Sequence, residues 1–364
     1  AHEIRQALIA AAGERGLASA SQEQADALRS EIINLLEFPS DADVVLGSSG
    51  TDLELLLSAL ALRANDQGLV NIIIAPDEVG GGGVLAAQAR HFDVRTPMST
   101  VVNRGAAVGG ILGQAVTVET VAVRNPAGQP LPLATIDTKV RSLVTKTLDA
   151  GKNVLLHLLD SSKTGLGGPS FEIAAKLHHD SPGRVWVVAD VAQMRISTEA
   201  LGRYLDEDFF LIVTGSKFYT GPPFSGALVM PAGNQELTTG RALPEGLWDY
   251  FTAVDLPERW AAQRPKLSRT ANIGLLVRWA AALAEMQAFH AVPPANRERY
   301  FIGYRDDITA LITQSPQFDL VDAPILPRPR TGRGEAWDQI QTIFTFTIRL
   351  GGELADMADA TAIY

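Results

Sequence analysis

The fold is decided by the stretch that contains KNVLLHLLD (152–160), RVWVVAD (184–190) and FFLIVTG (209–215). These three runs are almost purely apolar and have the length of β-strands. Apolar runs of this length with helices between them are typical of parallel strands that are buried on both faces. The stretch therefore predicts an α/β protein that is built on a parallel sheet.

The same alternation extends toward the N-terminus. Three further runs have the character of strands: DVVLG (43–47), LVNIIIAP (69–76) and TVETVAVR (117–124). Four segments have apolar residues at helical spacing: 22–38, 52–64, 84–92 and 135–151. Segment 94–116 is rich in Gly and Ala and fits neither pattern, so we expect a loop or hairpin insertion near a site. The predicted fold class is α/β, with a doubly wound, mostly parallel sheet.

After GALVMP (226–231), the regular alternation of helical patterns and apolar strand-like runs ends. Strong helical patterns cover 273–289 and 299–314, and the β-branched run 339–348 predicts a strand. We expect an N-terminal helix (1–20), a large domain (21–289) and a smaller α+β C-terminal domain (290–364) in this 364-residue chain. The sequence stops at ADATAIY, where a helix is starting, so we expect the small domain to be incomplete.

Composition excludes several classes of protein. Apolar residues make up 46% and charged residues 20%, which excludes disorder throughout. The net charge is 31 − 41 = −10, which disfavours nucleic acid as a partner. The chain has no cysteine, hence no disulfide, thiolate metal site or cysteine nucleophile. The histidines do not form a metal-ligand spacing, so we expect no metal. No apolar run is long enough to span a membrane and no signal peptide is visible, so we expect a cytoplasmic protein without a membrane contact.

Small, polar or charged residues follow five of the predicted strands. They stand at 47–51, 77–80, 160–165, 190–193 and 214–217. In parallel α/β sheets, ligands bind beyond the carboxyl ends of the strands, so this convergence predicts a site there. The loop GSSGTD (47–52) opens a helix and is typical of a phosphate cradle, in which backbone amides and the helix dipole hold an anion. The alternative is a plain helix cap by Ser49 or Thr51.

Asp190 and Lys217 each follow an apolar strand. The carboxylate of Asp190 either caps a turn or faces a cation. Lys217 lies within GSKFYTGPPFSG (215–226), where we expect partial desolvation to make its amine more nucleophilic. The alternative for Lys217 is an ordinary surface lysine. A phosphate cradle, a carboxylate and a lysine together indicate pyridoxal 5′-phosphate (PLP), with the lysine as its Schiff-base partner.

Four motifs carry a resemblance to a known family. They are SSGTDLELL (48–56), HLLDSSKTGLGGPS (157–170), VVADVAQ (187–193) and TGSKFYTGPPFSGAL (214–228). In this order they resemble fold-type I PLP enzymes, especially the class V aminotransferase and cysteine-desulfurase-like branch. The resemblance covers about residues 20–290, and the lysine motif is its most specific part.

The resemblance implies a role for each matching residue. Lys217 would form the internal aldimine, Asp190 would pair with the pyridine nitrogen and Gln193 would bond the phenolic oxygen. The residues implied in binding the phosphate are Gly50, Thr51, Thr214 and Ser216, and Ser49 is a further expected cofactor contact. Ser162 would lie near the ring, and Thr270 in SRTAN (268–272) would reach the phosphate of a second subunit in a homodimer with a shared active site. Where many relatives stack His or Trp on the ring, this chain offers Val79 or Glu78.

The resemblance implies an enzyme that acts on an amino acid or related amine through an aldimine and a carbanion. We expect an aminotransferase first, and a β/γ-lyase, a replacement enzyme or a carbon–carbon bond-forming enzyme second. The absence of cysteine argues against persulfide chemistry. The substrate carboxylate calls for an arginine, but we select none of Arg269, Arg328, Arg330 and Arg333, because PRPRTGRGE (327–335) is typical of a solvated loop.

Two remote alternatives remain open in the sequence. Gly81-x-Gly83-x-x-Ala86 stands where a dinucleotide fingerprint would stand, after a strand and at the start of a helix. An NAD-dependent dehydrogenase would also need an acidic residue about 20 positions later, and residues 100–110 contain none. The other alternative is a binding protein that keeps the fold without catalysis.

Overall fold

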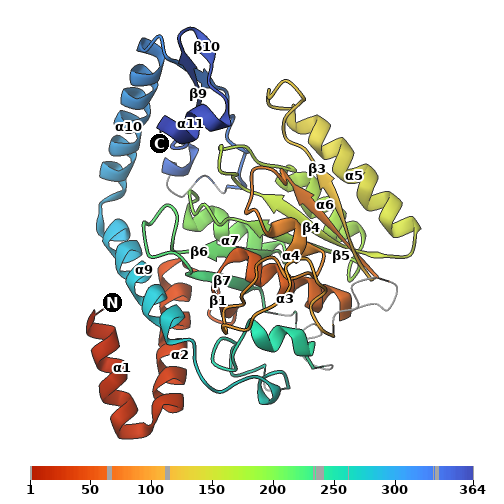
Figure 1. Ribbon diagram of the computed structural model, residues 1–364, viewed down its shortest axis with the longest axis vertical. Helices are drawn as coiled ribbons and strands as arrows, with labels where there is room; N and C mark the ends of the chain where they lie inside the picture. The colour runs from red at the N-terminus through yellow and green to blue at the C-terminus, as the bar shows by residue number, and fades with distance from the viewer. Residues whose placement is uncertain are drawn as a thin grey trace.

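The computed structural model describes residues 2–63, 68–110, 115–232, 234, 242–260, 262–330, 332 and 336–363. Its centre is a seven-stranded sheet with the strand order β1-β7-β6-β5-β4-β2-β3 (Figure 1). The strands are β1 (Asp43–Gly47), β2 (Leu69–Ile74), β3 (Val116–Val121), β4 (Asn153–Leu159), β5 (Val185–Asp190), β6 (Phe210–Thr214) and β7 (Gly226–Met230). The predicted doubly wound α/β class is therefore confirmed.

One strand of this sheet runs against the others. β7 pairs antiparallel with both β1 and β6, whereas β2 to β6 pair in parallel. The reason lies in the connection, because residues 215–225 join β6 to β7 without a helix and a parallel crossover usually needs one. The lysine motif therefore occupies the bend between two hydrogen-bonded strands.

Helices cover both faces of the sheet. The first face packs against α2 (Leu17–Leu35), α5 (Leu133–Asp149), α6 (Phe171–Asp180), α7 (Thr198–Asp206) and α9 (Ile273–Ala291). The second face packs against α3 (Gly50–Arg63), the short α4 (Gly83–Ala87) and residues 243–267. Within β1, Val44 and Leu46 pack into the first core and Val45 into the second, which is the period-2 alternation of a strand buried on both faces.

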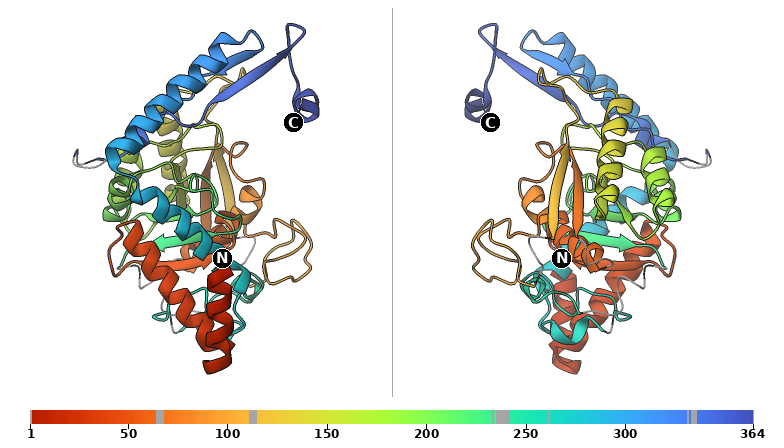
Figure 2. Two further views of the ribbon diagram at one scale, coloured as in Figure 1. Left: turned by 90° about the vertical axis from the view of Figure 1, so that its left-hand side faces the viewer. Right: turned by 90° about the vertical axis from the view of Figure 1, so that its right-hand side faces the viewer.

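The N-terminal and C-terminal parts extend this frame. α1 (His2–Arg15) precedes α2, and α9 leads to α10 (Pro294–Gln314) along one edge of the molecule (Figure 1). β8 (Phe318–Val321), β9 (Thr345–Leu350) and β10 (Glu353–Leu354) form a small antiparallel sheet, and α11 (Met357–Ile363) follows it. Figure 2 shows β9, β10 and α11 projecting away from the large sheet. The C-terminal part is thus α+β, while the domain boundaries at 20 and 289 stay a prediction.

Two predicted elements are shorter than expected. The strand predicted over 339–348 begins only at Thr345, because the preceding residues form the 3₁₀ turn Trp337–Gln339 and an extended segment against the large domain. The helix predicted over 84–92 ends at Ala87, and Ala89 then adopts a positive φ of 54°. In the described part of the chain, no helix combines the length and the apolar character that crossing a membrane requires.

Candidate active site

The strand ends of the large sheet surround one cavity of about 300 Å³. The predicted cofactor contacts that line it are Ser49, Gly50, Thr51, Val79, Ser162, Asp190, Gln193, Thr214, Ser216 and Lys217. They lie at or just after the ends of five strands, and the fold brings them together because parallel strands end at one edge of the sheet. Thr270 does not line the cavity; it is exposed elsewhere on the chain.

The first turn of α3 forms one wall of the cavity. The Ser49 hydroxyl accepts a hydrogen bond from the Asp52 amide at 3.2 Å and donates to the Asp52 carboxylate at 2.6 Å. Ser49 is thus a helix cap, as in the plain alternative, and it also borders the cavity. The first amides of a helix have no partner within the helix, so this turn is suited to an anion.

Glycines let the backbone approach closely at this wall. A Cβ atom on Gly226 would lie 3.0 Å from the backbone carbonyl carbon of Ser49. A Cβ atom on Gly50 would lie 3.0 Å from the Ile212 side chain. Both glycines border the cavity, and larger residues would displace the turn that the helix amides occupy. We call residues 47–52 the phosphate cradle.

Asp190 ends β5 inside the cavity. One carboxylate oxygen accepts a hydrogen bond from the Ala192 amide at 3.0 Å, and the Ala192 carbonyl accepts one from Thr214 at 2.8 Å. Burial raises the pKa of Asp190 above its usual value, although the Ala192 hydrogen bond and His157 act in the opposite direction. A cationic group placed against Asp190 would relieve this cost, so the position suits the protonated nitrogen of a ligand.

A buried histidine and glutamate lie beside Asp190, and sequence reasoning missed both. His157 borders the cavity, with its Nε2 atom 3.3 Å from the Glu54 carboxylate. Burial lowers the pKa of His157, but Glu54 and Asp190 outweigh this effect and leave the pKa above its usual value. No local pattern marks the pair, because Glu54 lies on α3 and His157 on β4.

Lys217 differs from the expectation in one respect. It lines the cavity, but its side chain is exposed rather than desolvated. The cause is its place in the bend after β6, where the chain has already left the core. Lys163 is the second lysine at the cavity, and its ammonium donates a hydrogen bond to the Val79 carbonyl at 2.9 Å. Lys217 is thus placed where it can reach a ligand in the cavity.

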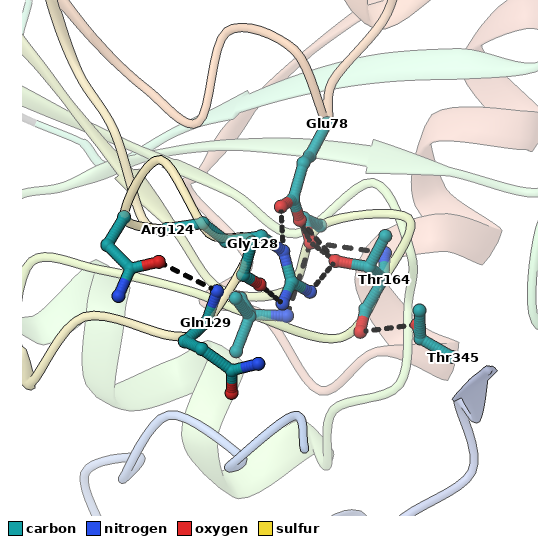
Figure 3. Close-up of polar contacts among 9 residues, drawn as sticks. Glu78, Arg124, Gly128, Gln129, Thr164 and Thr345 are labelled. Atoms are coloured by element: carbon teal, nitrogen blue, oxygen red, sulfur yellow. Dashed lines mark hydrogen bonds and ion pairs between the residues drawn. The ribbon is translucent and has the colours of Figure 1, made fainter. Parts of the chain in front are cut away.

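The loop after β2 carries a charged network at the edge of the cavity (Figure 3). The Glu78 carboxylate pairs with Arg124 at 2.6 Å and accepts hydrogen bonds from Ser162, at 2.7 Å, and from Thr164. Burial raises the pKa of Glu78, but these contacts outweigh burial and hold it below its usual value. Glu78 is therefore turned toward the loop after β4, and neighbouring Val79 is the apolar residue of this loop at the cavity.

Two arginines that the sequence places in a solvated loop, Arg328 and Arg330, instead lie against carboxylates. Arg328 is buried and forms two hydrogen bonds with the Asp160 carboxylate, at 2.7 and 2.8 Å. Arg330 pairs with Asp338 at 3.0 Å. The expectation of a solvated loop is wrong for these residues, because Asp160, which follows β4, pairs with Arg328, and Asp338, in the 3₁₀ turn Trp337–Gln339, pairs with Arg330. Arg269 is exposed and does not line the cavity, and Arg333 lies outside the described residues.

Within the described ranges, no group of three or more histidine, cysteine, aspartate or glutamate side chains is placed to hold a metal ion.

No protein-family model matches the sequence, and no curated protein matches it. Solved structures match over most of the chain. A cysteine desulfurase from Thermococcus onnurineus matches with a TM-score of 0.51 and 16% identity, over 95% of this chain and 72% of its own. TDC from Oryza sativa, solved with PLP and tryptamine, matches with a TM-score of 0.53 and 12% identity, over 94% of this chain and 63% of its own.

A sphingosine-1-phosphate lyase from Burkholderia pseudomallei gives a TM-score of 0.51 and 15% identity, over 90% of this chain and 70% of its own. The chain thus spans between 63% and 72% of the length of these three structures. At these identities the likeness concerns the arrangement of the elements and not the activity. The seven-stranded sheet, the helices on both its faces and these matches show that the chain has the fold of fold-type I PLP enzymes.

Proposed function

We propose that the cavity binds PLP and that the protein is an enzyme acting on an amino acid or a related amine. One observation carries the proposal: Lys217, Asp190 and the phosphate cradle border the same cavity, although they follow or end three different strands. These are the three groups that PLP requires, namely an amine, a carboxylate and an anion site. The fold supports the same cofactor, because the TDC structure that shares it contains PLP.

The residues present fit the cofactor. The volume of about 300 Å³ lies at the lower end of the range for small-molecule sites. The phosphate cradle offers helix amides to the cavity, and Asp190, whose pKa is raised by burial, offers a carboxylate that a cation would stabilise. Thr214 and Ser216 would add hydroxyl groups to the phosphate, and Gln193 and Ser162 would hold the polar edge of the ring.

When bound, PLP supplies an electron sink for the electrons of a bond broken at the substrate carbon. Lys217 would hold the cofactor covalently through Nζ and, once released, would move the proton at that carbon as base and acid. Asp190 would keep the proton on the ring nitrogen, and His157 beside it favours the ionised carboxylate. Val79 would present an aliphatic surface to the ring.

Amino transfer is the reaction that we place first, and elimination, replacement or carbon–carbon bond formation second. The similar structures include a desulfurase and a lyase, so the fold is compatible with several reactions. The absence of cysteine from this sequence supports a reaction other than persulfide transfer. Incubation with a panel of amino acids, with and without α-keto acids, separates the two classes by the mass of the products. A new keto acid means amino transfer, and a released side-chain group means elimination.

The central test uses the two lysines at the cavity. Protein purified with PLP should be yellow, and borohydride reduction should fix the cofactor on the peptide that contains Lys217. Lys217→Ala should abolish this adduct, and Lys163→Ala is the matched control that should keep it. Retention of the same visible absorbance and a reduced adduct in Lys217→Ala would overturn the proposal.

We also propose a homodimer in which each chain completes the site of the other, with Thr270 as the contributed residue. Its exposure on this chain is compatible with such a contact. A cytoplasmic location remains a prediction from the sequence.

A further inference from the structure

The loop after β2 presents Val79 to the cavity, but its own sequence does little to fix that position. Val79 is half-buried, packs against the first core and is followed directly by four glycines (80–83). Glycine loses more conformational freedom on folding than any other residue, so this run adds little order of its own. The position of Val79 therefore depends on the residue before it and on contacts with the neighbouring loops.

Glu78, the residue before Val79, is tied to the loops on both sides. β2 lies between β3 and β4 in the sheet, so the loops after those two strands flank it. From the β3 side, the Arg124 guanidinium pairs with the Glu78 carboxylate at 2.6 Å. From the β4 side, the Ser162 hydroxyl donates to the same carboxylate at 2.7 Å, and the Thr164 hydroxyl donates to it as well. The Glu78 clamp, as we call this group, consists of Glu78, Arg124, Ser162 and Thr164 (Figure 3).

The backbone of Glu78 is held as well as its side chain. Its amide donates to the Ala75 carbonyl at 2.9 Å, and its carbonyl accepts from the Lys163 amide at 3.2 Å. The loop after β4 is held in turn by the C-terminal sheet, because the Thr345 hydroxyl donates to the Thr164 carbonyl at 3.1 Å (Figure 3). Contacts from three other segments thus fix the residue that precedes Val79.

Arg124 serves the clamp and not a ligand. Its other two guanidinium nitrogens donate to the Gly128 carbonyl at 3.0 Å and to the Thr164 hydroxyl at 2.9 Å, so all three nitrogens have a partner. Its side chain is 17% exposed and that of Glu78 is 12% exposed. Arg124 is not among the described residues that line the cavity, whereas Glu78 and Val79 are. Arg124 can therefore influence the cavity only through the residues that it holds.

We propose that Glu78 and Arg124 are positioning residues that hold Val79 against one face of the cofactor ring. This inference rests on the proposed function, since it presumes PLP in the cavity. An aliphatic side chain makes few contacts with a ring, and a gap of about 0.5–1 Å already forfeits much of the attraction of each contact, so placement decides what Val79 contributes. The charge that maintains the clamp is stable, because its contacts outweigh burial and hold the pKa of Glu78 below its usual value.

A double-mutant cycle tests whether Arg124 acts through Val79. Val79→Ala removes two methyl groups from the ring contact and should weaken PLP binding by about 10-fold, measured by fluorescence titration of the apo-protein. Arg124→Met should weaken binding by about 3- to 10-fold, because no more than the Val79 contact can be lost. Added to Val79→Ala, Arg124→Met should change the PLP dissociation constant by less than about 2-fold.

Methyl NMR reports the placement of Val79 without any turnover. A methyl group over the face of an aromatic ring shifts upfield through the ring current, so PLP should move the Val79 methyl signals upfield in the wild type. Their absence from the spectrum of Val79→Ala assigns these signals. The upfield shift should shrink in Arg124→Met, and Arg124→Lys should recover part of it, because lysine keeps the charge but not the forked donors.

Arg141→Met is the matched control, because it removes an exposed arginine on α5. It should keep the PLP dissociation constant and the Val79 shift of the wild type. Urea unfolding of each apo-protein shows whether the variant folds. If Arg124→Met does not fold, Glu78→Gln takes its place in the cycle, because the amide keeps an oxygen acceptor but loses the charge that pairs with Arg124. We expect it to be equally without further effect when it is added to Val79→Ala.

The outcomes separate the two proposals. If borohydride does not trap the cofactor on Lys217 of the wild type, the proposed function fails. If trapping succeeds but Val79→Ala leaves the PLP dissociation constant and the ring-current shift shows no contact, the positioning role is overturned and the cofactor site stands. Losses of affinity from Val79→Ala and Arg124→Met that multiply in the double variant would overturn the positioning role in the same way.

Discussion

Asp52 shows how a single residue at the phosphate cradle couples pH to stability. Burial raises its pKa from the ordinary 3.8 to about 6, against its hydrogen bonds with Ser49. Between these two values the folded chain binds more protons than the unfolded chain, so stability falls as pH rises from about 4 to 6 and then levels off. Above pH 6, we expect the buried Asp52 carboxylate to lower the free energy of unfolding by about 3 kcal/mol.

Asp52→Asn should remove that decline. Urea unfolding between pH 4 and pH 8 measures it, as the difference in unfolding free energy between wild type and variant. Asp41→Asn is the control, because Asp41 is exposed and should leave the pH dependence unchanged. If the unfolding free energies of wild type and Asp52→Asn change with pH in parallel, the prediction is wrong.

At the scale of elements, the Asp160–Arg328 pair joins the end of β4 to the segment before β9. Both side chains are buried, with 1% and 3% exposed, and Tyr204 also donates to Asp160 at 3.3 Å. Arg328→Met would leave the carboxylate buried without its partner, and we expect a loss of about 3–5 kcal/mol in unfolding free energy. Replacing both partners, as Asp160→Leu with Arg328→Met, should restore most of that loss because no charge is left unpaired.

Urea unfolding of the single and double variants forms a double-mutant cycle. The control is Arg349→Met, since the pair of Arg349 with Asp319 is largely exposed and should be worth less than about 1 kcal/mol. If the losses in unfolding free energy of Asp160→Leu and Arg328→Met simply add in the double variant, the pair does not join the two elements.

The whole molecule is expected to act as a homodimer with a shared site. Lys217→Ala and Thr270→Val each damage the site, but on opposite chains. A hybrid dimer of the two variants should therefore contain one site with both native residues and one with neither. Thr270→Val alone should weaken PLP binding by about 10-fold, through the loss of a hydrogen bond to a charged group, and the hybrid should recover native affinity in half of its sites.

Fluorescence titration of PLP into the purified hybrid measures this recovery, and light scattering gives the assembly state. The Lys217→Ala homodimer, mixed with itself, is the control and should show no trapped cofactor. A monomeric protein, or a hybrid with no native site, would rule out the shared arrangement.

Much of the fold and of the site could be predicted because both depend on regular patterns. Apolar runs such as 153–159 and 185–190 mark strands buried on two faces, and parallel strands must end at one edge. The sequence therefore predicts that residues at those ends, such as Gly50, Asp190 and Lys217, lie close together. All three line the same cavity.

Charge pairing and exposure were decided only by the tertiary structure. Asp160 and Arg328 are 168 residues apart, and Glu54 meets His157 across two elements, so no local pattern could link them. The exposure of Lys217 follows from the bend between two antiparallel strands. The sequence by itself determined which residues reach the edge of the sheet, since periodicity is a local property. Only the tertiary structure decided which charges are neutralised, because partners are chosen by packing between distant segments.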